Sequence, residues 1–205
     1  MLEFGLAVDV RQFFAKAQHL YGDRQWKLAP HDALDKLMEF FAARLRNYFM
    51  SQGQDTLLVD AALGAGAEDV KDCGARLEAL AAFSQAADYE AAVQTFKRVA
   101  NILRKQGQAE ELSDHWDPAL LREDAEKALA STLEEMLPRL DALWAAHDHA
   151  AALACLSAVR PAVDAFFAGV MVMCDDVDLR RNRLSMLHGL GSRFARLADF
   201  SALQM

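Results

Sequence analysis

The feature that most constrains the fold is a helical hydrophobic repeat that runs through almost the whole sequence. Apolar residues recur at i, i+3, i+4 and i+7, the spacing that places them on one side of an α-helix. The 205 residues include only four prolines and ten glycines, which favours long helices over many short strands. The sequence therefore predicts an all-α bundle of about eight to nine helices.

Aspartates and prolines indicate where these helices begin and end. Asp32 and Asp55 are typical helix caps, and Asp117-Pro118 is a typical helix start because proline suits the first turn. Gly107 is expected to end a helix, and Pro161 to separate two helices. The expected helices cover 8–21, 32–51, 55–63, 70–83, 88–105, 118–147 with a kink at Pro138, 149–159, 160–173, and a last one that starts within 175–178.

The length suits a leading helical arm, residues 1–30, followed by one helical domain, residues 31–205. The net charge of −8 comes from a single segment. Residues 107–150 carry eleven of the 30 acidic residues and only three of the 22 basic ones, so the rest of the chain is balanced. Affinity for phosphate depends on local basic surface more than on total charge. We expect the acidic segment to face away from any nucleic acid.

Several classes of protein are disfavoured. The three cysteines, Cys73, Cys155 and Cys174, lack the paired spacing of zinc or disulfide frameworks and are expected to be reduced thiols. No apolar run reaches the length expected of a membrane span, and no signal peptide is visible. A cytoplasmic protein without a membrane partner is expected.

No catalytic site is predicted. The sequence has no phosphate-binding glycine loop, nucleophile elbow or cofactor motif. His147 and His149 flank Asp148, but residues two apart on a helix do not face each other, so no metal site is expected. We expect no catalytic residues, no metal and no cofactor in this chain.

The C-terminal segment carries a distinctive combination of motifs. It joins an apolar helix end to an Asp-Asp break and an arginine-rich amphipathic helix. This segment resembles the C-terminal end of the bacterial glycyl-tRNA synthetase beta subunit, which closes with a DALR-type anticodon-binding domain. The matching positions are Val170–Met173 (VMVM), Asp175-Asp176, Leu179-Arg180, Asn182-Arg183-Leu184 and Ala198-Asp199, with further similarity in FKRVANILRK (96–105) and RLRNYF (44–49).

The resemblance implies a tRNA-binding part of a larger enzyme. In that family glycine is attached to tRNA with ATP, a separate alpha subunit performs the adenylate chemistry, and the beta subunit mainly holds tRNA. The implied partners are glycine-accepting tRNA and the alpha subunit, with no DNA. The chain itself is expected to be non-catalytic and to lack the domains that precede this part. The residues that name the DALR domain read Val177-Asp178-Leu179-Arg180, so only the Leu-Arg half is kept.

Basic side chains on the 96–105 helix are the main candidates for RNA contact. Phe96, Val99, Ala100 and Leu103 share one side of that helix and are expected to be buried. The opposite side suits a phosphate backbone and base edges, but it also suits a solvated surface, and both interpretations stay open. Reversal of charge at Lys97 and Arg98 is expected to leave the stability of the fold nearly unchanged. These candidate positions are Lys97, Arg98, Asn101, Arg104 and Lys105.

Arginines at two further places complete the candidate set. Arg180 and Arg181 flank the apolar stripe of the last helix, whereas Arg183 projects onto it. A buried guanidinium must be paired, so Arg183 is expected either to pair with Asp175 or Asp176 or to contact the anticodon loop. On the 44–49 segment, Arg44 and Arg46 are candidates for tRNA contact.

Two other functions remain open. One is a DALR domain of an arginyl-type synthetase, which the 96–105 segment and the Leu-Gln ending disfavour. The other is a helical protein-interaction module that does not bind RNA.

Overall fold

The computed structural model describes residues 8–22, 27–106 and 112–203, and the expected helix end at Gly107 lies outside them. Within these ranges the chain forms eight α-helices, two short 3-10 helices and no β-strand, which confirms the all-α prediction. The elements are α1 (Val10–Leu20), α2 (Pro30–Ser51), α3 (Thr56–Gly64), α4 (Val70–Phe83), α5 (Tyr89–Gln106), η2 (Pro118–Leu120), α6 (Asp124–Ala145), α7 (His149–Gly169), α8 (Val177–Phe194) and η3 (Phe200–Ala202).

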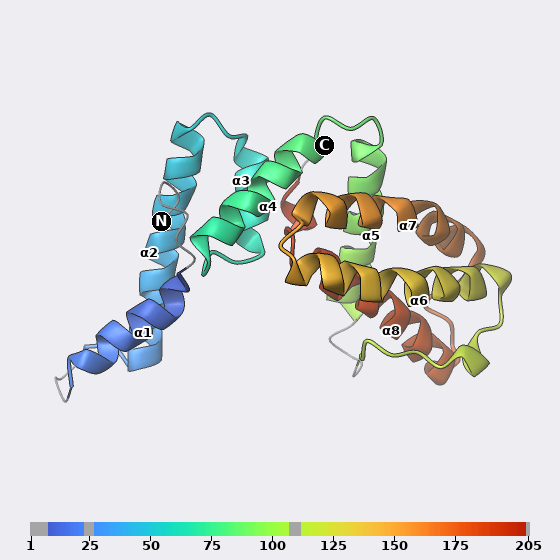
Figure 1. Ribbon diagram of the computed structural model, residues 1–205. Coiled ribbons are helices and arrows are strands. Elements are labelled where there is room, and N and C mark those ends of the chain that lie inside the picture. The colour runs from blue at the N-terminus through green and yellow to red at the C-terminus, as the bar shows by residue number, and fades with distance from the viewer. Residues whose placement is uncertain (1–7, 23–26, 107–111, 204–205) are drawn as a thin grey trace.

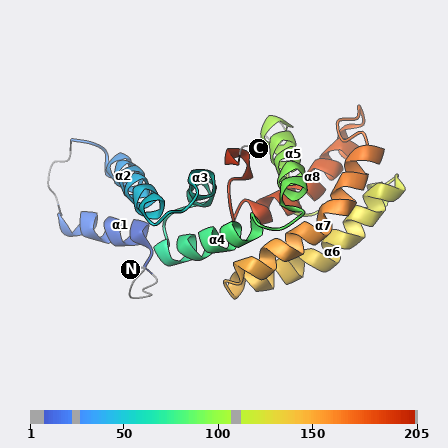
Figure 2. The same ribbon diagram turned by 90° about the horizontal axis from the view of Figure 1, so that it is seen from above.

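The helices form an elongated molecule with a compact end. Helices α5 to α8 pack together at that end, α3 and α4 lie in the middle, and α1 and α2 extend to the other side (Figure 1). Seen from above, α6 and α7 lie side by side and α5 crosses near α8 (Figure 2). Helix α1 packs on α2, with the rings of Phe14 and Phe41 6.0 Å apart. A domain boundary at residue 30 stays a prediction.

Aspartate capping explains most helix starts. The carboxylates of Asp55, Asp69 and Asp176 each accept a hydrogen bond from a backbone N–H in the first turn of the helix that follows, which confirms the expectation for Asp55. Asp32 is not a cap, because Pro30 starts α2 and leaves Asp32 inside the first turn. Proline fits there because its missing N–H would have no intrahelical partner.

Two expected boundaries around the longest helices are wrong. Asp117-Pro118 starts only the short helix η2, and α6 begins at Asp124, where Glu126 accepts a hydrogen bond from the Arg122 N–H. Helix α7 continues through Pro161, so the two helices expected there are one. By length and composition α7 could cross a membrane, contrary to the sequence expectation. It is, however, partly buried between other helices, as the core helix of a globular domain would be.

The segment after α8 joins the compact end of the molecule to α3 and α4 in its middle. The N–H of Asp199 donates to the carbonyl of Ala61 in α3 (2.8 Å), and Arg76 of α4 donates to the carbonyls of Ala62 (2.6 Å) and Leu197 (3.1 Å). Because Arg76 is only 4% exposed, these bonds lie in the protein interior. The three phenylalanines Phe96, Phe194 and Phe200 form an aromatic cluster beside this junction.

Helices α5 and α8 approach each other closely at Gly191. A Cβ atom at this position would lie 2.5 Å from Cδ1 of Leu103, so a larger residue would require the Leu103 side chain to move. The glycine therefore leaves room for the Leu103 side chain between the two helices, although glycine lowers helix propensity by about 1 kcal/mol relative to alanine.

Candidate nucleic-acid interface

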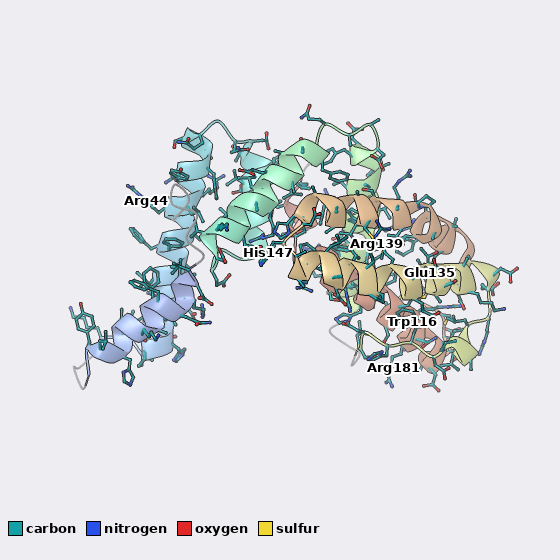
Figure 3. All side chains as sticks on the ribbon, viewed as in Figure 1. Arg44, Trp116, Glu135, Arg139, His147 and Arg181 are labelled. Carbon is teal, nitrogen blue, oxygen red and sulfur yellow. The ribbon has the colours of Figure 1, made fainter. Side chains whose placement is uncertain are left out.

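The ten candidate residues belong to three separate helices. Arg44 and Arg46 belong to α2, in the extended part of the molecule, whereas the others belong to α5 and α8. Figure 3 shows the exposed Arg44 at the opposite end of the molecule from Arg181. The candidates therefore do not form one continuous site.

Arg46 is held by an ion pair with α3. Its Nη2 donates to Oδ2 of Asp60 at 2.9 Å. This hydrogen bond, and the charge of Arg46, keep the pKa of Asp60 below its ordinary value. Because the carboxylate neutralises much of the field of the guanidinium, Arg46 is a weaker candidate for phosphate binding than Arg44.

Lys97 has a structural role that the helical pattern did not reveal. Its Nζ donates to the backbone carbonyl of Leu203 at 2.6 Å, and its side chain is half-buried. The expectation that charge reversal at Lys97 would leave stability unchanged is therefore wrong. A carboxylate at this position would face a carbonyl oxygen and remove the hydrogen bond that holds Leu203 against α5.

The remaining candidates on α5 share one surface, named here the α5 basic surface, which consists of Arg98, Asn101, Arg104 and Lys105. Its three cationic side chains are exposed, and Asn101 is half-buried. Arg98, Asn101 and Lys105 are spaced i, i+3 and i+7, which places them in one row. The guanidinium of Arg98 lies 4.1 Å from the ring centroid of Phe167, and Arg104 donates to Oδ1 of Asn101 at 2.9 Å. These contacts orient the side chains, and neither neutralises a charge.

A second basic group lies at the start of α8. Arg181 is exposed, and Arg180 is half-buried with its Nη1 donating to the carbonyl of Cys174 at 2.9 Å. Sequence reasoning missed Arg122, which is also exposed and pairs with the cap residue Asp176 at 2.6 Å. No sequence signal singles out Arg122, because it lies within the acidic segment. The pKa of Asp176 is lowered first by the Leu179 N–H and then by Arg122.

Arg183 is buried and pairs with Glu126, not with Asp175 or Asp176 as expected. Its Nε and Nη2 contact Oε1 of Glu126, and its Nη1 donates to the carbonyl of Met171 at 2.8 Å. The side chains of Arg183 and Glu126 are 5% and 0% exposed. The pair joins α8 to the first turn of α6. Arg183 therefore has a structural role, and its burial disfavours the alternative of a direct contact with the anticodon loop.

The neighbouring Asn182 also holds the fold together. Its Oδ1 accepts from the N–H of Asp117 at 2.7 Å, and its Nδ2 donates to the carbonyl of the same residue at 3.0 Å. These two bonds fix the segment before α6 against α8. The Asn-Arg-Leu motif of this helix is therefore a structural element.

A pocket of about 500 Å³ opens beside Trp116, between the segment before η2 and α6. Among the residues that the structure describes, its walls include three carboxylates, from Asp114, Glu134 and Asp141, and one guanidinium, from Arg193. Arg193 is already paired with Asp114 (2.6 Å) and Asp141 (3.2 Å). Excess negative charge makes this pocket unsuitable for phosphate. That the acidic segment faces away from RNA stays a prediction.

The structure also brings together two histidines that sequence reasoning had separated. Helix α6 ends at Ala145, and His147 adopts a left-handed backbone conformation with φ of 54° in the turn before α7. The rule for residues two apart on a helix therefore does not apply. His147 and His149 both face Asp72 of α4.

Comparison with known proteins agrees with the C-terminal motifs. A family model described as the DALR anticodon binding domain matches residues 92–198, which run from α5 to just beyond α8. The chain is 59% identical over 207 aligned residues to the glycine–tRNA ligase beta subunit of Nitratidesulfovibrio vulgaris strain Hildenborough, 58% to that of Oleidesulfovibrio alaskensis and 38% over 210 to that of Lawsonia intracellularis. Each alignment covers all of this chain and 30% of the relative. These matches favour the glycyl over the arginyl alternative.

Proposed function

Because the chain belongs to the DALR anticodon-binding domain family, we propose that it binds the anticodon arm of glycine-accepting tRNA. The main support for this proposal is the position of the family match in the chain. Residues 92–198 contain both the α5 basic surface and the arginines at the start of α8. The region similar to anticodon-binding domains thus presents exposed cations on two of its helices.

The mechanism follows from the side chains available. Arg98, Arg104 and Lys105 neutralise phosphates of the RNA backbone, which fixes the position of the tRNA arm without reading its sequence. The amide of Asn101 and the planar guanidinium of Arg98 provide hydrogen bonds and a stacking surface for unstacked bases. Arg181 forms a second contact on the same tRNA, and Arg122 adds a weaker one because Asp176 neutralises part of its field. Arg44 and Arg46 of α2 are peripheral contacts.

The rest of the proposal concerns the complete enzyme. As part of a glycine–tRNA ligase beta subunit, the chain would support ATP-dependent attachment of glycine to tRNA in the cytoplasm, with adenylate chemistry in the alpha subunit. It would not bind DNA or a membrane. Exposed apolar side chains on α1 and α2, including Phe13 (57%) and Phe40 (70%), support a protein partner for the extended part of the molecule.

Charge reversal on the α5 basic surface tests the function. Arg104→Glu with Lys105→Glu removes two exposed cations near the end of α5 and avoids the buried contacts of Lys97. The double variant should bind tRNA more weakly. The slope of log K against log salt should become shallower by about 0.7 to 0.9 for each phosphate that the protein no longer neutralises. The measurement is a tRNA mobility shift at several salt concentrations.

The matched control is Lys16→Glu with Lys127→Glu, which changes the net charge equally at exposed positions of α1 and α6. It should bind tRNA as the unmodified chain does. A melting curve for each variant separates binding from folding, since glutamates at a helix C-terminus cost about 0.3 to 1 kcal/mol each. Equal loss of affinity in both double variants, or no loss in either, would show that the α5 basic surface does not hold tRNA.

A further inference from the structure

Three potential metal ligands converge where α4 meets the α6–α7 turn. Oδ1 of Asp72 lies 2.9 Å from Nδ1 of His147 and 2.9 Å from Nε2 of His149. The three atoms all lie within 4.8 Å of one another. Figure 3 shows His147 at this end of α6, beside α4. Two imidazoles and one carboxylate form the ligand set that zinc and similar ions accept in proteins.

The local structure fixes each ligand in place. His149 opens α7 and has a side chain only 3% exposed, so its ring is held by packing. His147 is directed toward Asp72 by the left-handed turn between the helices. Arg76 donates its Nε to Oδ2 of Asp72 at 2.8 Å, which leaves Oδ1 facing the imidazoles. A carboxylate ligand that is itself hydrogen-bonded is common in metal sites, because outer partners orient the ligand.

An ion can reach this cluster from solvent. A surface pocket of about 310 Å³ is lined by residues that include Asp72 and His147, and His147 is exposed. The nearby charges are mixed, because Asp69 and Lys71 also line the pocket and Arg76 lies behind Asp72. The guanidinium of Arg76 lowers affinity for a cation, whereas the two carboxylates raise it.

We propose that Asp72, His147 and His149 bind a divalent transition-metal ion of the zinc class. Oδ1, Nδ1 and Nε2 are the three protein ligands, and the fourth position faces the pocket. Zinc bonds of about 2.0 to 2.2 Å in a tetrahedral site place ligand atoms roughly 3.3 Å apart. The two separations of 2.9 Å therefore need to open by about 0.4 Å. Two nitrogen ligands disfavour Mg²⁺ and Ca²⁺, which prefer oxygen.

The site would link two parts of the chain that are distant in sequence. Asp72 belongs to α4, which precedes the segment matched by the family model, whereas both histidines lie inside it. A bound ion would hold α4 against the α6–α7 turn and thereby stabilise the folded state. The inference is independent of tRNA binding, because the cluster contains no residue of the α5 basic surface.

Metal titration of the metal-free chain tests the proposal, with His147→Asn as the variant. Asparagine tolerates the left-handed conformation at this position but is a poor zinc ligand. His19→Asn is the matched control, because His19 is an exposed histidine of α1. At free Zn²⁺ a hundredfold above Kd, the melting temperature of the unmodified chain should rise by about 5 to 10 °C. Calorimetric titration should give one ion per chain.

The His19→Asn control should match the unmodified chain in zinc affinity and in the rise of its melting temperature. His147→Asn should bind zinc at least about tenfold more weakly and should not show the rise in melting temperature. Mg²⁺ at the same concentration should leave the melting temperature unchanged. The proposal is overturned if Zn²⁺ produces no saturable rise, if His147→Asn keeps both affinity and rise, or if Mg²⁺ produces an equal effect.

Discussion

Removal of the Arg183 guanidinium is the sharpest test of how this fold is held together. In Arg183→Ala, the carboxylate of Glu126 would remain in the interior with 0% exposure and without its cationic partner. The variant would also leave the carbonyl of Met171 without its 2.8 Å hydrogen bond from Arg183. Breaking a buried pair by removing one partner typically costs about 3 to 5 kcal/mol, because the remaining charge is uncompensated.

The expected magnitude lies near the lower end of that range. Glu126 keeps two hydrogen bonds, since its Oε2 accepts from the Arg122 N–H at 2.8 Å and from the Glu123 N–H at 3.4 Å. We therefore expect the free energy of unfolding to fall by about 3 kcal/mol, which lowers the melting temperature by roughly 6 to 12 °C in a domain of this size. The double variant Glu126→Gln with Arg183→Met removes both charges and should recover most of this loss, because well-packed neutral replacements of buried pairs are often nearly neutral.

Urea unfolding followed by circular dichroism at the helical band measures these differences. Arg139→Ala is the matched control, because it removes an exposed arginine from α6, the helix that carries Glu126, and should change stability by less than about 0.5 kcal/mol. A loss below about 1 kcal/mol in Arg183→Ala would refute the reasoning, given the cost expected for an unpaired buried charge. So would a double variant no more stable than Arg183→Ala, since it would show that the unpaired carboxylate is not the cause.

Two further outcomes are expected. The pKa of Asp60 is lower in the folded chain than in the unfolded chain, where it is about 3.9. The pair of Asp60 with Arg46 therefore stabilises the fold fully above about pH 3.9. This stabilisation is lost as the pH falls through the lower pKa of the folded chain. The urea midpoint of the unmodified chain should thus fall more steeply below about pH 4 than that of Asp60→Asn, and parallel curves would exclude the pair as a cause. The purified chain alone should show no glycine-dependent ATP–pyrophosphate exchange, because no nucleotide-binding motif is present in the sequence; exchange that copurifies with the chain would contradict this expectation.

Helix positions could be predicted from the sequence wherever local rules decide them. Asp55 caps α3 as expected, because the cap needs only a side chain and the backbone two or three residues later. The helix break expected at Pro161 is wrong because proline removes one hydrogen bond, and packing of α7 against α4 and α6 outweighs that cost of about 3 kcal/mol. Local rules cannot weigh tertiary contacts, so they fail where burial compensates an unfavourable residue.

The candidate site was predictable only in part, because the partners of charged side chains are distant in sequence. The helical pattern places Lys97 on an exposed helix face, yet its acceptor, Leu203, lies 106 positions away. The same pattern places Arg183 near the neighbouring aspartates, yet it pairs with Glu126 on another helix. The exposed row that ends at Lys105 was predictable, since helical spacing alone determines which residues share a solvated face.

The structural unit extends beyond the family match. The matched segment spans residues 92–198, but its end and the residue that follows it are held by groups that precede residue 92. Arg76 donates to the carbonyl of Leu197, and Ala61 accepts from the N–H of Asp199. Breaking these bonds would leave buried backbone groups without partners, at a cost of about 1 to 3 kcal/mol each. Helices α3 and α4 are therefore bonded directly to the segment that follows α8, and we expect them to unfold together with α5 to α8.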